Sequence, residues 1–459
     1  MQTHNKKVRK KRICAKIYKG NTKTHMFRLP AAEFYPARKQ LSRKDAPLRA
    51  ECMKYLVLLL DGAADEPVEE LGFRTPLEVA KKPYMNFLAQ NGEVGMLNPT
   101  PRGCTGGSDT GNMCVLGFNP AQYLTGRSPL EAASLGIKME EDDVALRANL
   151  VTLSGDGPYE QKTMEDYSAD EISTEEAARL IACLEQHFGS ETLRFYPGFS
   201  YRHCVIMHHA TANEQLTPPH NITGRCIKDY MPKGDYADML TDIMIRSNKL
   251  LSEHPVNLAR AAKGKRMANS VWFWGQGTKP MLPSFRERHG LNGAVVTAVD
   301  LVKGLAFLTG MKIYPVEGAT GTLDTNFAGK AQAAIQAFKD GFDLVYLHLE
   351  APDECGHRHE VEGKVKAIEE IDSKVLAPVY KYLKSQGDFG ILVTPDHPTP
   401  LTTRAHSNAP VPFIIYRSDV APIAPAENYC EADAKKNAVV LNEGYMAISR
   451  MIIAGKPFL

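Results

Sequence analysis

The sequence predicts an α/β protein with a doubly wound, mostly parallel sheet, into which a smaller α+β domain is inserted. Three apolar segments of strand length each run into an acidic residue: KYLVLLL at Lys54–Leu60, FDLVYLHL at Phe342–Leu349 and FGILV at Phe389–Val393. Nearly continuous apolar runs of this kind are typical of strands buried on both faces. Helical spacing at Gly329–Lys339 and Val361–Leu383 separates them, and alternation of strands and helices indicates a parallel sheet.

The chain of 459 residues is too long for a single compact core. Its middle part mixes strand-like and helical segments, namely Arg147–Leu153, Tyr201–His208 and Thr174–His187. We therefore expect a core domain from residues 53–136 and 268–459, and an inserted smaller α+β domain over residues 137–267.

The amino-terminal segment differs in charge from the rest. Residues 1–52 hold 15 Lys+Arg and 3 Asp+Glu, a net charge of +12 in a chain whose total is +2. The segment lacks hydrophobic periodicity and the apolar stretch of a secretory signal. We expect a disordered basic extension, with Met53 starting the folded domain; a targeting or nucleic-acid-binding tail is the alternative. No nucleic-acid partner is expected for the core.

Composition narrows the class of protein. Hydrophobic residues make up 43% and charged residues 24% of the chain, as in ordinary globular proteins. No apolar run approaches 18 residues, so no membrane-spanning helix is expected. The nine cysteines form no CxxC pair, which favours a reducing compartment, and we expect a cytoplasmic location.

Acidic residues follow the three predicted strands directly or within four residues. Ligands in such sheets bind at the carboxyl ends of the strands. One acid at a strand end is commonly a helix cap, but three, two of them near histidines, indicate a site. The candidate ligands are Asp61, Asp353, His357, Asp396, His397 and His406. Mixed oxygen and nitrogen donors suit Mn²⁺, Zn²⁺ or Co²⁺ better than Ca²⁺, and six ligands are enough for two ions.

A second motif, Gly106–Asn112, reads GGSDTGN and precedes an apolar run. It predicts a loop that enters a helix, where backbone amides stabilise anions and Ser108 can receive a phosphoryl group. The alternative is that Ser108 or Asp109 simply caps the helix. A nucleotide-binding P-loop is not expected, because GxxxxGK[ST] does not occur.

Together these motifs carry a resemblance over Met53–Leu459. The chain resembles the alkaline phosphatase superfamily and, within it, the archaeal-type cofactor-independent phosphoglycerate mutases. The motifs are Asp61-Gly, Gly-Ser108-Asp-Thr, Tyr123-Leu-Thr-Gly-Arg127-Ser-Pro-Leu-Glu131, Arg147-Ala-Asn, Tyr-Arg202-His203, Asp353-xxx-His357, Asp396-His397 and Ala-His406.

The resemblance implies an alkaline phosphatase-like, metal-binding core at residues 53–136 and 268–459 and a substrate-binding role for the inserted domain at residues 137–267. It also implies an activity and a site. One divalent ion is held by Asp353, His357 and His406, and the other by Asp61, Asp396 and His397 with Ser108. Mn²⁺ is the first expectation, with Zn²⁺, Co²⁺ or Mg²⁺ as alternatives. Ser108 takes up the phosphoryl group of a small phosphorylated metabolite, and the phosphoserine returns it to another hydroxyl of the retained glycerate. This reaction interconverts 3-phosphoglycerate and 2-phosphoglycerate.

Further residues receive roles from the same resemblance. Arg127, Arg147 and Arg202 are expected to bind carboxylate and phosphate groups, because guanidinium binds both bidentately. Arg127 is also expected to take part in catalysis, and His203 to act as a general acid and base between the two glycerate oxygens. The alternatives are surface ion pairs for the arginines and a packing role for His203.

Two other functions stay open at this stage. Asn112 stands where relatives commonly carry His, and three segments look like a mutase-like subgroup proposed as homoserine kinases: His254–Asn257, Ala268–Trp272 and Ala351–His357. A phosphotransferase on homoserine, dependent on an external donor, is therefore the alternative enzyme. A nonenzymatic binding protein is disfavoured, because unused ligands would leave a costly cluster of like charges. The oligomeric state is left open.

Overall fold

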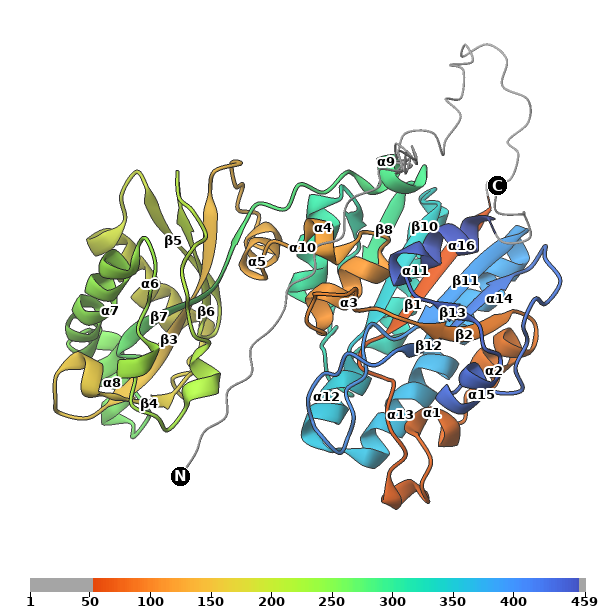
Figure 1. Cartoon of the computed structure of the whole chain (residues 1–459), viewed down its shortest axis with the longest axis horizontal. Coiled ribbons are helices and arrows are strands. Elements are labelled where there is room, and N and C mark those ends of the chain that lie inside the picture. Colours follow the sequence, from red (N-terminus) through yellow and green to blue (C-terminus); the bar gives the residue numbers. More distant parts are fainter. Residues whose placement is uncertain (1–52, 454–459) are drawn as a thin grey trace, which may run out of the picture. The chain divides into compact units, whose positions relative to one another are not determined.

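The computed structural model of the chain describes residues 53–453, so the expectations for residues 1–52 lie outside the described part. This part contains two sheets with their helices (Figure 1). None of its helices combines the length and the apolar character needed to cross a membrane.

The larger sheet confirms the predicted fold class. Its eight strands, in spatial order, are β13 (Val440–Leu441), β2 (Glu93–Leu97), β12 (Val411–Arg417), β11 (Phe389–Thr394), β1 (Lys54–Leu60), β10 (Leu344–Leu349), β8 (Gly293–Val296) and β9 (Lys312–Ile313). Neighbouring strands are parallel except that β12 runs antiparallel to both β11 and β2. The three strands predicted from apolar runs, β1, β10 and β11, lie side by side at its centre.

Strand β1 shows why its sequence is apolar throughout. Leu56, Leu58 and Leu60 belong to one apolar core, whereas Val57 and Leu59 belong to another. Side chains alternate between the two faces of a strand, so a strand covered on both faces needs apolar residues at every position. The first core is completed by α2 (Pro83–Gln90), α11 (Phe327–Lys339), α13 (Val361–Glu370) and α14 (Ala377–Gln386), and the second by α3 (Ser108–Val115), α10 (Asp300–Leu308) and α16 (Ala447–Ile453).

The helical segment predicted at Val361–Leu383 is interrupted. A π-helical stretch, Ile371–Leu376, separates α13 from α14. It carries Asp372, a fully buried carboxylate that accepts hydrogen bonds from the backbone N–H groups of Tyr84 (3.2 Å) and Met85 (2.7 Å). These amides open helix α2, where N–H groups lack partners within the helix. Asp372 thereby fixes the start of α2 against the π-helical stretch.

The second sheet is antiparallel throughout. It comprises β4 (Thr163–Asp166), β3 (Val144–Ser154), β6 (Arg202–Met207), β5 (Leu193–Phe199) and β7 (Ser270–Thr278), the last paired with β3. Helices α6 (Thr174–Phe188) and α7 (Ala237–Ser252) pack on one face. Strand β7 lies in the range expected for the core, so the sheet of the inserted region extends to Thr278 rather than ending by residue 267.

The register of the large sheet brings the acidic strand ends together. Leu60 pairs with Leu349, and Leu59 pairs with Thr394. Because β1, β10 and β11 are parallel and in step, their following loops begin at the same edge of the sheet.

Candidate active site

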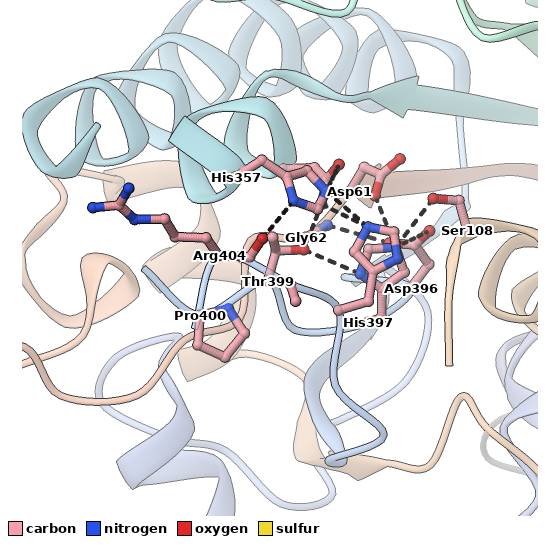
Figure 2. A network of polar contacts seen from close by, with 12 residues as sticks. Asp61, Gly62, Ser108, His357, Asp396, His397, Thr399, Pro400 and Arg404 are labelled. Atoms are coloured by element: carbon pink, nitrogen blue, oxygen red, sulfur yellow. Dashed lines mark hydrogen bonds and ion pairs between the residues drawn. The ribbon is translucent and has the colours of Figure 1, made fainter. Parts of the chain in front are cut away.

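The predicted ligands meet at this carboxyl edge. Figure 2 labels Asp61, His357, Asp396 and His397 among them. Asp61 follows β1, and Asp353 lies in the first turn of α12 (Ala351–Arg358) after β10. Asp396, His397 and His406 come from the long loop between β11 and β12. That loop contains four prolines before β12, and proline has no backbone N–H to donate to a helix or a sheet.

One cluster consists of Asp353, His357 and His406. His357 Nε2 lies 3.3 Å from Asp353 Oδ2, and His406 Nε2 lies 3.5 Å from Asp353 Oδ1. The two Nε2 atoms face each other at 2.9 Å, while His357 Nδ1 contacts the carbonyl oxygen of Arg404 at 2.9 Å. Hydrogen bonding to Asp353 raises the pKa of His357 to about 9. Three donor atoms thus converge on one point, as a cation requires.

A second cluster surrounds His397. Its Nε2 atom lies 3.2 Å from Ser108 Oγ, 3.3 Å from Asp61 Oδ1 and 3.5 Å from Asp396 Oδ2. Asp61, Asp353 and His397 also offer ligand atoms within 4.8 Å of one another. Asp353 therefore stands between the two clusters, a shared position that the sequence-based assignment to a single ion did not include.

The charges of these side chains also fit cations. Within residues 53–453, no hydrogen bond reaches the buried Asp61 Oδ1. Burial, followed by the charges of Asp396 and Asp353, raises the pKa of Asp61 well above its usual value. Burial acts in the same direction on Asp353, but hydrogen bonds from His357 and His406 outweigh it and hold that pKa well below the usual range. Crowded carboxylates beside imidazoles are a suitable donor set for Mn²⁺ or Zn²⁺, so the residues fit the divalent ions expected from the sequence.

Gly62 is required by the shape of the site. Its φ is +60°, and an added Cβ would lie 2.5 Å from Asp353 Oδ1 and 2.6 Å from Thr399 Oγ1. An L side chain is disfavoured at this φ and has no space here. The Asp61-Gly62 pair therefore combines a ligand with the turn that lets a neighbouring ligand approach.

Ser108 is the first residue of α3, and no side chain caps this helix. Asp109 instead accepts a hydrogen bond from the adjacent Thr110 N–H at 2.8 Å. The Gly103–Thr110 segment lines an open pocket of about 610 Å³, together with Arg127 and His406. Ser108 therefore faces a pocket rather than serving as the helix cap.

Asn112 supports the site from α3. Its side-chain NH₂ donates to Asp396 Oδ2 (2.7 Å) and to the Ser108 carbonyl (2.9 Å), and its oxygen accepts from the Tyr346 hydroxyl (2.8 Å). Asn112 is completely buried. Asn112 thus orients the candidate metal ligand Asp396 and the helix that begins at Ser108.

The predicted arginines gather around Glu131 and the second sheet. Arg127 Nε and Arg147 Nε each lie 3.0 Å from a different oxygen of Glu131. Arg147 is buried, lies over the Trp274 ring at 4.3 Å, and has a pKa lowered to about 10 by burial. Arg202 shares this face of the sheet, because its pairing partner Asn149 lies two residues from Arg147.

His203 lies on the other face. His203 pairs with Ala148. Val205 lies two residues further along β6, on the same face as His203, and belongs to the apolar core under α6 and α7. Its Nδ1 accepts a hydrogen bond from Gly198 N–H at 3.0 Å, and burial lowers its pKa to about 3. The structure does not bring His203 together with the three arginines, and this placement favours the packing alternative.

His348 is a site residue that the sequence reasoning missed. It is fully buried, and its Nε2 lies 3.0 Å from Asp61 Oδ2 while its Nδ1 contacts Thr297 Oγ1 at 3.3 Å. Burial lowers its pKa to about 3, so it stays neutral and orients Asp61. The available signal was a single imidazole in an otherwise apolar strand, one residue before the strand end.

The fold and the site together define a class of protein. It is an α/β protein with a candidate metal-binding cluster beside a serine, at the carboxyl edge of the parallel strands of its large sheet.

Comparison with known proteins narrows this class to a family. A family model described as 2,3-bisphosphoglycerate-independent phosphoglycerate mutase matches residues 89–257. A Methanosarcina barkeri protein of that name is 47% identical over 85% of this chain and 96% of its own length. A Geobacter sulfurreducens protein named as a probable member is 43% identical over 87% and 100%. The chain therefore belongs to the 2,3-bisphosphoglycerate-independent phosphoglycerate mutase family.

Solved structures agree on the fold. The PH0037 protein from Pyrococcus horikoshii is 28% identical, with a TM-score of 0.71 over 89% of this chain and 99% of that one. A cofactor-independent phosphoglycerate mutase from Thermoplasma acidophilum is 24% identical, with a TM-score of 0.61 over 87% and 99%.

None of these names supports the homoserine alternative. One of the segments that suggested the homoserine alternative contains Asn257. Its side chain forms hydrogen bonds with the backbone of Leu251 and Ala268, a contact that stabilises the inserted region.

Proposed function

We propose that this chain interconverts 3-phosphoglycerate and 2-phosphoglycerate through a phosphoserine at Ser108. One observation supports this function most directly: Ser108 Oγ lies 3.2 Å from His397 Nε2, within the Asp/His cluster and at the wall of the pocket. This geometry occurs in a chain that is 47% identical to a relative named for the mutase. The substrate is accordingly a small phosphorylated metabolite.

The covalent steps balance on Ser108 and the substrate. Ser108 Oγ forms a bond to phosphorus as the bond from phosphorus to glycerate O3 breaks; the serine loses a proton and O3 gains one. The retained glycerate then presents its 2-hydroxyl, which loses a proton as it takes the phosphoryl group and restores Ser108. No nucleotide and no net proton are consumed. Because a phosphoserine can also be hydrolysed, the site must exclude water during the exchange.

The two Asp/His clusters are the proposed metal sites. Asp353, His357 and His406 would hold one divalent ion, and Asp61, Asp396 and His397 would hold the other beside Ser108. When bound, the ions supply positive charge that favours an ionised serine and stabilises the transferring phosphoryl group. We propose Mn²⁺, with Zn²⁺, Co²⁺ and Mg²⁺ as alternatives, from the mixed carboxylate and imidazole donors.

The arginines are proposed to hold the substrate anions. Arg127 lines the pocket that Ser108 faces. Arg127 and Arg147 share one carboxylate, Glu131, so an incoming phosphate or carboxylate can replace part of that pairing without leaving an unpaired charge. Arg202 provides a further cation on the same face of the second sheet as Arg147. We assign no chemical step to His203.

The location of the reaction is also a proposal. The described cysteines are free thiols, which is consistent with a reducing compartment such as the cytoplasm.

The function is tested by ³¹P NMR of Mn²⁺-loaded protein. One sample receives 3-phosphoglycerate alone, a second receives homoserine and ATP, and Ser108→Ala is the control in both. We expect 2-phosphoglycerate in the first sample, no phosphohomoserine in the second, and neither product with the variant. Phosphohomoserine without isomerisation would overturn the substrate assignment, and full activity of Ser108→Ala would overturn the nucleophile.

A further inference from the structure

A buried lysine lies directly behind the candidate metal ligands. Lys364, on α13, is fully buried, and its ammonium donates to Asp65 Oδ2 at 2.6 Å and to the carbonyl oxygen of Thr399 at 2.8 Å. The sequence reasoning gave this residue no role, because a lysine in a helical segment is normally a solvated side chain. Its two partners come from the loops after β1 and β11, which are the loops that carry Asp61, Asp396 and His397.

Asp65 ties the first loop to the second. It lies four residues after Asp61, and its carboxylate accepts a hydrogen bond from Leu401 N–H at 3.1 Å. Its own N–H donates to Glu431 Oε1 at 3.0 Å. Asp65 is therefore paired with Lys364 and also fixed at its backbone, so its position is set independently of any bound ion.

Thr399 carries the connection on to the ligands. Its hydroxyl donates to Asp353 Oδ1, and the same oxygen lies 3.2 Å from His397 Nδ1 (Figure 2). Its backbone N–H donates to the Ala64 carbonyl at 3.3 Å. Thr399 is thus the single residue between Lys364 and one candidate ligand of each cluster, namely Asp353 and His397.

Stability alone does not account for this buried charge. Removing an ammonium and a carboxylate from water costs several kcal/mol per ion, and replacing buried ion pairs by apolar residues is often neutral or stabilising. An apolar side chain at position 364 could bind neither Asp65 nor the Thr399 carbonyl. What the ion pair adds is a fixed distance between two loops.

We propose that Lys364 is a positioning residue that joins the two ligand-bearing loops and thereby sets the affinity of the site for divalent ions. The inference rests on the metal assignment of the proposed function but not on the identity of the substrate. Partners behind metal ligands typically change metal affinity by about 10- to 100-fold when they are removed.

The test compares Lys364→Met with the matched control Lys82→Met in the full chain. Lys82 is also buried, but it donates to the Leu77 carbonyl and contacts neither Asp65 nor Thr399 in the described structure. Mn²⁺ affinity is measured by competition with a chelator, without substrate, and the melting temperature of the metal-free protein is recorded alongside. We expect about 10- to 100-fold weaker Mn²⁺ binding for Lys364→Met and less than a threefold change for Lys82→Met.

A second variant keeps the inference testable if Lys364→Met does not fold. Asp65→Asn keeps the size of the side chain but removes the charge that Lys364 binds, and it should weaken Mn²⁺ binding in the same direction. Unchanged Mn²⁺ affinity in a folded Asp65→Asn or a folded Lys364→Met would overturn the positioning role. Wild-type protein that binds no Mn²⁺ would overturn the metal assignment itself. Wild-type protein that binds Mn²⁺ without isomerising 3-phosphoglycerate, with weakened binding in Lys364→Met, would support the inference and sink the proposed function.

Discussion

The raised pKa of His357 predicts that metal binding expels a proton. In the metal-free protein the hydrogen bond to Asp353 raises this pKa to about 9, so the imidazole is protonated at neutral pH. A metal ion needs the neutral imidazole, so binding must displace that proton. The apparent metal affinity therefore increases with pH until about pH 9 and becomes weaker as the pH is lowered. For one displaced proton, the change is about tenfold per pH unit.

Isothermal titration calorimetry measures this displacement. Metal-free protein is titrated with Mn²⁺ at pH 7.0 in two buffers of different ionisation enthalpy, and the difference in heat gives the number of protons released. We expect about one proton per ion at the Asp353–His357–His406 cluster, and tenfold tighter binding at pH 8.0 than at pH 7.0. His357→Asn should abolish the release along with most of the affinity. Zero proton release by the wild type, with pH-independent affinity, would refute the reasoning.

Three further perturbations follow from the structure. His406→Ala should lose bound metal and activity together while the metal-free protein keeps its circular dichroism spectrum; full activity in a metal-poor sample, measured by elemental analysis, would sink the two-metal assignment. Gly62→Ala should destabilise the protein by about 1–2 kcal/mol from the left-handed conformation alone and weaken Mn²⁺ binding by displacing Asp353; a wild-type urea midpoint and affinity would contradict the steric argument. Burial raises the pKa of Asp372 to about 6, from 3.8. The protonated side chain of Asp372 therefore stabilises the folded protein fully below pH 4. This contribution, at most about 3 kcal/mol, is lost as the pH rises through 6. Urea unfolding of the wild type and of Asp372→Asn at pH 4.5 and 7.5 measures this loss. The wild type should lose more stability than the variant between the two pH values, and equal losses would count against the prediction.

Much of the sheet and the grouping of the candidate ligands could be predicted because both depend on local sequence. Strands such as Lys54–Leu60 are recognisable as apolar runs, and in a parallel sheet their ends must share an edge. The acids and histidines that follow them could therefore be grouped without coordinates. The sequence could not show that Asp353 stands between the two clusters, because this depends on the turn at Gly62 and on side-chain directions.

Other features needed the three-dimensional pairing. His348 and Lys364 sit in a strand and a helix whose local patterns say nothing of their partners, which lie about 287 and 299 residues away in sequence. The role assigned to His203 was not supported because β-strand alternation turns it away from its neighbour Arg202. The pairing of β7 with β3 could not be predicted, because β7 returns to this sheet only after α7 and α8 (Pro255–Ala262).

The central claim is that Ser108 carries the phosphoryl group between the two positions of glycerate. The most direct test mixes Mn²⁺-loaded protein with 3-phosphoglycerate, quenches the reaction in acid within milliseconds, and maps the phosphorylated peptide by mass spectrometry. The account predicts phosphate on Ser108 and its absence in Ser108→Ala. Phosphate on Thr110, or label that persists in the Ser108→Ala variant, would contradict it.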